Sequence, residues 1–395
     1  MNRHQPSRRS LLALLGAAPL VTGSALASPG ISQADTSHSD RVARDLLPGG
    51  TFDQFVAQLA AEDKFSGTVL LVHRGRTVLA RSHGMANEQL PVPNGPDTIF
   101  SLGSITKLFT AVAVAQLAQA GKVAYHEKVG TYLDGFPPEI AGGATVHHLL
   151  THGSGLADYM QSDGFWVQAP NWSSTEEVWN GSMAFVRKAA PTFTPGTGYL
   201  YSNTGYHILG AIVAQVSGQS YYDYVRDNIF RTARMNVSGF YTTPQWRDDA
   251  RIARPYVLQP SGERVDGLDR HIFIGSPAGG ALANAPDLVR FADALLGGKL
   301  LDRAYTELTL SAKMPRRPMG PPGTSELLFG TYAPAATLVD DQWVLWHNGG
   351  APGVSTHLDM FPHSGWTAVT LRNYDSPMGQ PEPVAAMARR LIIAG

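Results

Sequence analysis

The chain has 395 residues, 43% of them hydrophobic, and a formal net charge of −1. This length predicts a globular protein with one large or two medium domains, and the near-neutral charge argues against nucleic acid and anionic membrane surfaces as partners. The absence of cysteine excludes disulfides, thiolate catalysis and cysteine-bound metal.

The first 27 residues have the features of an export signal. Arg8 and Arg9 form a twin-arginine start, residues 11–20 are apolar, and Ala25-Leu26-Ala27 is a small-x-small cleavage site. The apolar stretch is shorter than a bilayer span requires, so a membrane anchor is the less favoured alternative. We therefore expect a twin-arginine signal peptide over 1–27, no membrane span in the mature chain, and a periplasmic or secreted protein.

Downstream, the apolar pattern alternates between strand and helix. A leader rich in Ser, Asp, Gly and Pro covers 28–50 and is expected to be flexible. Helices are expected over 52–60, 104–120, 176–188, 206–216, 221–230, 286–296 and 383–393, and strands over 67–72, 77–80, 343–346, 354–361 and 367–371. Strands near both chain ends around a helical middle predict an α+β fold. In this fold an antiparallel sheet from both chain ends, flanked by helices, forms an α/β domain over 51–122 and 275–395, and a mainly helical domain is inserted over 123–274.

The helix expected over 104–120 carries almost no charge after Lys107, so it should lie deep in the fold. Ser104 and Lys107 are one helical turn apart and project from the same face. Burial and the positive end of the helix both disfavour the ammonium form, so Lys107 can be partly neutral and accept a proton from the Ser104 hydroxyl. Ser104 is therefore a candidate nucleophile.

Two further segments contain residues that can take part in catalysis. Tyr201-Ser202-Asn203 precedes an amphipathic helix. The Tyr201 phenol can exchange a proton with Ser104 or with a leaving group if a nearby cation lowers its pKa. The Asn203 amide can position a substrate carbonyl. The alternative is a tyrosine packed at a helix start. His347-Asn348-Gly349-Gly350 follows the strand expected over 343–346, and its glycine N–H groups can bind an oxyanion. His347 adds a donor of adjustable charge, and a hairpin turn is the alternative.

Taken in order, Ser104-Ile105-Thr106-Lys107, Tyr201-Ser202-Asn203 and His347-Asn348-Gly349 resemble the three active-site motifs of the serine β-lactamase and penicillin-binding-protein superfamily. The variant is similar to class C β-lactamases, D-alanyl-D-alanine carboxypeptidases and related esterases. Further matches lie at 149–156, 201–218 and 279–283, so the resemblance covers about 51–394.

This resemblance implies a role for each residue. Ser104 would form an acyl-enzyme, Lys107 and Tyr201 would transfer its proton, and the substrate would contact Asn203, His347, Gly349 and Gly350. The backbone N–H groups of Ser104 and Gly350 would form the oxyanion hole. Since β-lactamases of this class usually carry lysine where this chain has His347, an esterase or D-Ala-type peptidase is favoured over a true β-lactamase.

Three other classes of protein fit this sequence less well. An α/β-hydrolase needs Gly-x-Ser-x-Gly, which is absent. His147, His148 and His152 suggest a metallohydrolase, but no His-Glu-x-x-His follows. A non-catalytic penicillin- or peptide-binding module would not need Ser104, Lys107 and Tyr201 together. We expect an ester, a D-amino-acid peptide or a β-lactam as substrate, without metal or organic cofactor, while Phe165, Trp166 and Trp172 either line the site or belong to the core.

Overall fold

The computed structural model describes residues 42–316, 326–375 and 382–395. The signal peptide expected over 1–27 and the leader up to residue 41 lie outside the described residues. The prediction of a flexible leader is wrong for residues 42–50. This segment contains a 3-10 helix, η1 (Arg44–Leu46), and Leu46 is buried in an apolar cluster with Phe52 and Val56. The ordered chain therefore begins before residue 51.

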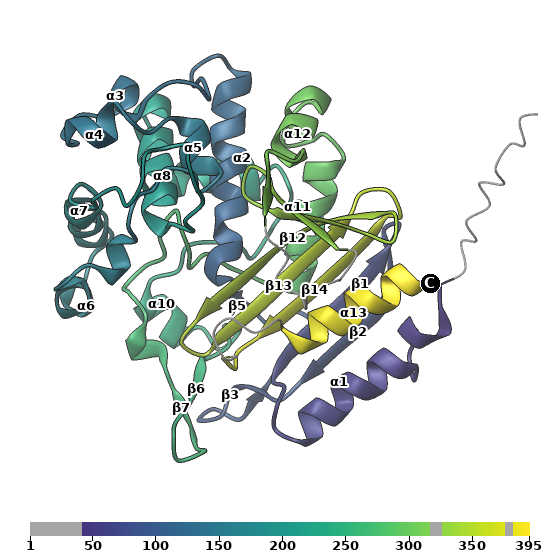
Figure 1. The fold of residues 1–395 in the computed structure, drawn as a ribbon. Coiled ribbons are helices and arrows are strands. Elements are labelled where there is room, and N and C mark those ends of the chain that lie inside the picture. The colour runs from purple at the N-terminus through teal and green to yellow at the C-terminus, as the bar shows by residue number, and fades with distance from the viewer. Residues whose placement is uncertain (1–41, 317–325, 376–381) are drawn as a thin grey trace, which may run out of the picture. The chain divides into compact units, whose positions relative to one another are not determined.

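An antiparallel sheet of eight strands, in the order β2-β1-β14-β13-β12-β11-β10-β9, forms the centre of the fold (Figure 1). The N-terminal hairpin pairs directly with the C-terminal strand β14, which confirms a sheet built from both chain ends. The strands are β1 (Gly67–His73), β2 (Arg76–His83), β9 (Met314–Arg316), β10 (Leu327–Gly330), β11 (Ala335–Val339), β12 (Gln342–Ala351), β13 (Val354–Phe361) and β14 (Trp366–Arg372).

Helices cover both faces of this sheet (Figure 1). Helices α1 (Thr51–Ala61) and α13 (Pro383–Ala394) pack on one face, and α11 (Ala285–Leu296) packs on the other. In β1, Val69 and Leu71 belong to the apolar cluster of the first face, whereas Leu70 and Val72 belong to that of the second. A strand buried on both faces is apolar at successive positions, which explains the continuous run in β1.

Helix α2 (Thr106–Gln119), preceded by the 3-10 helix η2 (Gly103–Ile105), runs through the larger apolar cluster. All of its residues are buried except Gln116 and Gln119. The deep position expected from its lack of charge is therefore confirmed, and Lys107 is completely buried in its first turn.

Most elements between residues 123 and 274 are short helices (Figure 1). Among them, α8 begins three residues earlier than expected, which places Asn203 in its first turn. The domain boundaries at 123 and 274 stay a prediction. The helices are α3 (Val129–Tyr132), α4 (Pro138–Ala141), α5 (Val146–Leu150), α6 (Phe165–Gln168), α7 (Thr175–Val186), α8 (Asn203–Ser217), α9 (Tyr221–Val225) and α10 (Thr243–Asp248), with η3 (Tyr159–Gln161) and η4 (Ala169–Asn171) between α5 and α7.

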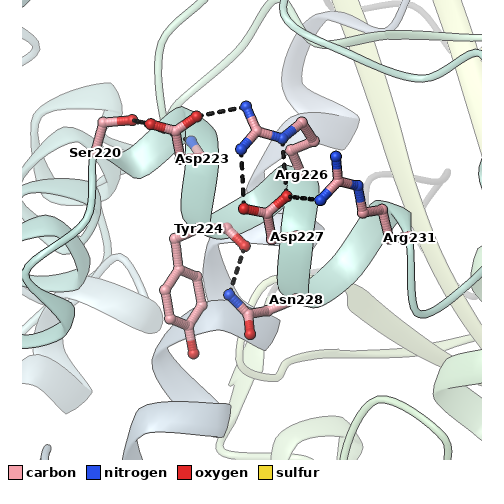
Figure 2. A network of polar contacts seen from close by, with 7 residues as sticks. All are labelled: Ser220, Asp223, Tyr224, Arg226, Asp227, Asn228 and Arg231. Atoms are coloured by element: carbon pink, nitrogen blue, oxygen red, sulfur yellow. Dashed lines mark hydrogen bonds and ion pairs between the residues drawn. The ribbon is translucent and has the colours of Figure 1, made fainter.

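The helix expected over 221–230 changes at Arg226 from α9 to a π-helix, η5 (Arg226–Phe230). Figure 2 shows that Arg226 donates to Asp223 and Asp227, and that Arg231 pairs with Asp227 at 2.7 Å. These side chains are largely exposed to solvent, so their ion pairs define local geometry more than global stability.

The remaining elements are small. They are α12 (Arg303–Leu310), η6 (Leu268–Arg270), and the two-stranded pairs β3 (Met85–Asn87) with β4 (Val92–Pro93), β5 (Phe100–Ser101) with β8 (Leu282–Ala283), and β6 (Tyr256–Leu258) with β7 (Arg264–Asp266). Within the described ranges, no helix is both long and apolar enough to cross a bilayer.

Candidate active site

Ser104 and Lys107 lie together where η2 leads into α2. The Lys107 Nζ atom is 3.1 Å from Ser104 Oγ, 2.8 Å from Asn203 Oδ1 and within hydrogen-bond distance of the Ala278 carbonyl oxygen. The structure therefore brings together three of the residues expected at the site, and adds a main-chain carbonyl from the loop before β8.

The environment of Lys107 favours its neutral form. Complete burial lowers its pKa to about 7, and the negative charge of Asp158 opposes this shift in part. A neutral amine has two N–H donors and one lone pair, whereas the two oxygens, on Asn203 and Ala278, only accept. When these oxygens take both N–H groups, the lone pair is left facing the Ser104 hydroxyl, which is the geometry of a general base.

Tyr201 lies just before α8, with its ring centroid 4.8 Å from Lys107 Nζ. Burial around its hydroxyl raises the pKa of Tyr201, and a hydrogen bond with Ser104 counteracts this only in part. The condition that a nearby cation lowers the pKa of Tyr201 is therefore not met, because desolvation outweighs the effect of an amine that is itself half-neutral. The phenol stays protonated near neutral pH and can act as a proton donor.

Asn203 is oriented by partners on both ends of its amide. Its Oδ1 accepts from Lys107, and its Nδ2 donates to Asp158 Oδ2 at 2.7 Å. The Ser202 hydroxyl caps α8 by accepting from the Gly205 N–H at 3.3 Å, which fixes the start of this helix. Asp158 was missed from the sequence, although it comes two residues after the matching segment 149–156.

The glycine pair lies inside β12 and not after it, as the strand expected over 343–346 had implied. Pairing with β11 ends at Trp346, so the following part of β12 has no strand on that side among the described residues. A Cβ atom on Gly349 would be 1.9 Å from the Leu102 carbonyl oxygen, and one on Gly103 would be 2.7 Å from the Gly350 nitrogen. Glycine thus lets the backbone of β12 lie directly against the turn that carries Ser104.

His347 is a buried residue of β12, and its Nδ1 lies 2.7 Å from the Asn348 carbonyl oxygen. Burial, together with the nearby charge of Lys107, lowers the pKa of His347 to about 3. The imidazole is therefore neutral throughout the physiological range, and its charge is not adjustable there as the sequence had suggested. It can donate or accept a hydrogen bond, but it does not supply a positive charge.

Comparison with known proteins shows which family has this arrangement of motifs. The model of the family described as Beta-lactamase matches residues 52–391, which include all the segments that meet at the site. The chain belongs to the beta-lactamase family. The resemblance to the serine β-lactamase and penicillin-binding-protein superfamily, and the α+β fold that it implies, are both confirmed.

The proteins that are similar to this chain include both penicillin-binding proteins and an esterase. A penicillin-binding protein of Bacillus subtilis (strain 168) is 29% identical over 348 residues, which cover 85% of this chain and 74% of that protein. The esterase EstB of Burkholderia gladioli is 30% identical over 236 residues, covering 55% of this chain and 57% of the esterase. The crystal structure of a penicillin binding protein from Bacillus halodurans has a TM-score of 0.73 and 28% identity, covering 85% of this chain and 99% of that one.

Each histidine of the segment 147–152 has a different partner in this beta-lactamase-family fold. His147 Nδ1 lies 2.9 Å from the Tyr332 hydroxyl, and His148 Nδ1 accepts from the Thr145 N–H. His152 Nδ1 accepts from the Ser202 N–H at 3.1 Å. Within the described residues, no group of three or more histidine, aspartate or glutamate residues is arranged to hold a metal ion.

The aromatic residues proposed to border the site separate into two kinds. Phe165 is fully buried, with edge contacts to Tyr159 and Trp172, so it belongs to the core. Trp166 is 50% exposed on α6. Phe165 and Trp166 are consecutive residues of a helix, so their side chains point to different sides, which accounts for their different exposure to solvent.

Replacing Gly349 by alanine is expected to destabilise this beta-lactamase-family fold by about 2–3 kcal/mol, because the added methyl group would overlap the Leu102 carbonyl and force β12 away from η2. Urea unfolding followed by circular dichroism measures the change. Gly95→Ala is the matched control, since its nearest neighbour would be 3.9 Å away. Equal stability of the two variants would contradict the close approach.

Proposed function

We propose that this protein is an exported serine hydrolase that cleaves an ester or a D-Ala-type peptide bond through an acyl-enzyme on Ser104. The proposal rests on the surroundings of Lys107, where Asn203 Oδ1 and the Ala278 carbonyl can take both N–H groups of the neutral amine and leave its lone pair for the Ser104 hydroxyl. Assignment to the beta-lactamase family supports a serine hydrolase, and the choice of substrate is our own inference.

The reaction follows from the positions of these groups. Lys107 takes the Ser104 proton as Oγ attacks the substrate carbonyl, and the backbone N–H groups of Ser104 and Gly350 stabilise the oxyanion. Tyr201 then donates a proton to the leaving group, which breaks the ester or amide bond and leaves the acyl group on Ser104. Water attacks the acyl group in the reverse sequence of proton transfers, which regenerates the free hydroxyl.

The neutral state of His347 supports a neutral ester over substrates with a carboxylate, which include both β-lactams and peptides that end in D-Ala. A lysine at this place would attract a substrate carboxylate, whereas the buried imidazole carries no charge at neutral pH. Similarity to the esterase EstB agrees with this preference. A true β-lactamase and a binding-only module are the alternatives.

Labelling and turnover test the proposal together. The protein is treated with a fluorescent penicillin and with a fluorophosphonate, and rates are then measured on a nitrophenyl ester and on a D-Ala-D-Ala peptide. Ester turnover without peptide turnover would select the esterase, and the reverse would select the peptidase. Labelling without turnover of any substrate would favour the binding module.

The pH dependence of kcat/KM on a neutral ester should rise to a plateau with an apparent pKa near 7, because Lys107 must be neutral to accept the Ser104 proton. His347 stays neutral over this range, and Tyr201, with its raised pKa, stays protonated. A profile measured from pH 5 to pH 10 should therefore show one rising limb. A flat profile would remove Lys107 from the role of base.

His347→Lys is expected to raise the rate of acylation by benzylpenicillin about 5- to 50-fold, since an ammonium group near Ser104 would attract the penicillin carboxylate. The rate on a neutral nitrophenyl ester should not rise. Stopped-flow measurement of acylation provides both values. If the penicillin rate is unchanged, His347 does not limit that reaction.

Export is a separate part of the proposal. The twin-arginine start and the small-x-small site before Ser28 support cleavage after Ala27. Intact mass spectrometry of the protein from the periplasm or culture medium should give a mature chain that begins near Ser28. A chain that still begins at Met1 would contradict cleavage.

A further inference from the structure

His152 forms hydrogen bonds with both residues that flank Tyr201 in the sequence. Its carbonyl oxygen accepts from the Leu200 N–H at 3.0 Å, and its Nδ1 accepts from the Ser202 N–H at 3.1 Å. Residues 192–202 form no helix or strand, so no regular backbone ladder fixes this stretch. The two bonds from one residue, together with the Ser202 cap of α8, therefore hold the backbone on both sides of Tyr201.

The ring of His152 also packs against the side chain of Tyr201. The two ring centroids are 4.5 Å apart, and the Tyr206 ring lies 5.1 Å from His152 on α8. Tyr206 is itself fixed by a hydrogen bond from its hydroxyl to the Leu150 carbonyl at 2.9 Å. Tyr201 is 39% exposed, so contact with His152 restrains a ring that would otherwise have more freedom.

The backbone of His152 has an uncommon conformation for a residue with a side chain. Its φ of +57° lies in the left-handed region, immediately after α5, and the residue is only 7% exposed. Such a conformation persists when the surrounding contacts determine it, and it is found repeatedly at functional sites. Here it turns the carbonyl and the imidazole of one residue toward the same neighbouring segment.

The hydrogen bond at Nδ1 also defines the state of the ring. A neutral imidazole that accepts at Nδ1 carries its proton on Nε2, whereas a protonated ring could not accept from Ser202. Burial and the nearby charges of Lys107 and Arg316 hold the pKa of His152 well below its usual range. The contact with Ser202 is thus maintained across the pH range in which the site would work.

We propose that His152 is a positioning residue for Tyr201, which holds the phenol in line to donate its proton to the leaving group. The inference rests on the proposed function, because it assumes that Tyr201 protonates the leaving group. It predicts that the loss of His152 slows reactions that need this proton much more than reactions that do not.

Two acetate esters with different leaving groups separate these effects. An alkyl alcohol must be protonated as it leaves, whereas p-nitrophenolate departs without a proton. In His152→Phe, which keeps an aromatic ring and loses the acceptor, kcat/KM for the alkyl ester should fall about 30- to 100-fold, and that for the nitrophenyl ester by less than about 5-fold. His152→Asn tolerates the left-handed conformation and offers an oxygen acceptor, so it should recover part of the alkyl ester rate.

His147→Phe is the matched control, because His147 lies five residues earlier, in α5, and contacts Tyr332 instead of the Tyr201 segment. It should leave the ratio of the two rates unchanged. Equal losses on both esters in His152→Phe, or no loss, would overturn the positioning role. If that variant does not fold, the same ratio measured in His152→Gly decides, because glycine tolerates the left-handed conformation and has no side-chain acceptor. An unchanged ratio together with lower thermal stability would make His152 merely structural. Failure of the proposed function is recognised separately, by full activity of Ser104→Ala.

Discussion

Ser104→Ala is expected to lower kcat/KM on a nitrophenyl ester by at least about a thousandfold, because the variant has no oxygen to form the acyl-enzyme. Lys107, Tyr201 and the oxyanion donors remain, so a small residual rate above the uncatalysed reaction is expected. The Ser104 side chain is only partly buried, and its removal leaves α2 and its packing intact. The thermal midpoint should therefore change by no more than about 2 °C.

Two measurements test whether the loss of activity in Ser104→Ala is due to the loss of the nucleophile. Labelling by the fluorophosphonate should disappear in Ser104→Ala and persist in Ser261→Ala, in which an exposed serine far along the chain is changed. Mass spectrometry of the labelled wild-type protein should place the added mass on the peptide that contains Ser104. Persistent labelling of the alanine variant would remove Ser104 from the role of nucleophile.

Lys107→Met is expected to lower the same kcat/KM by about a thousandfold or more, since the Tyr201 phenol beside Ser104 has a raised pKa, stays protonated and cannot take the serine proton. Methionine has a similar length and flexibility, so it can fill the space of the lysine side chain. The fold should be retained, and stability should be unchanged or greater by up to about 2 kcal/mol. Activity and stability would thus change in opposite directions.

The stability gain should depend on pH in a defined direction. The pKa of Lys107 is about 7 in the folded protein and 10.5 in its ordinary state, so the unfolded chain binds more protons between these values. Wild-type stability should therefore rise with pH across this window, and the penalty for burying the charge is complete below pH 7. The advantage of Lys107→Met should be largest near pH 6 and decrease toward pH 10.

Urea unfolding at several pH values measures this difference. Lys122→Met changes an exposed lysine just after the C-terminus of α2 and should show no such pH dependence. If Lys107→Met were less stable than the wild type at pH 6 by several kcal/mol, the amine would be contributing favourable contacts that exceed its cost of burial. That result would contradict the neutral base.

The sequence predicted the elements whose pattern is local and strong. Helix α2 was recognised from apolar spacing without charge, and the C-terminal strands from their apolar runs. Strands β9, β10 and β11 were missed because they are short, and β9 contains Pro315, which argues against a strand. The glycine pair was placed after β12 and not within it, because glycine usually marks the end of a strand.

By itself, the sequence determined the superfamily, the sheet from both chain ends, and Ser104 with Lys107 on one helical face, because all three depend on spacing and motif order along the chain. The tertiary structure decided the charge states, since burial keeps the Tyr201 phenol protonated and His347 neutral against what the residue types suggested. It also brought Asp158, Ala278 and His152 to the site. Desolvation and main-chain contacts between distant segments leave no pattern in the chain, so only the folded arrangement reveals them.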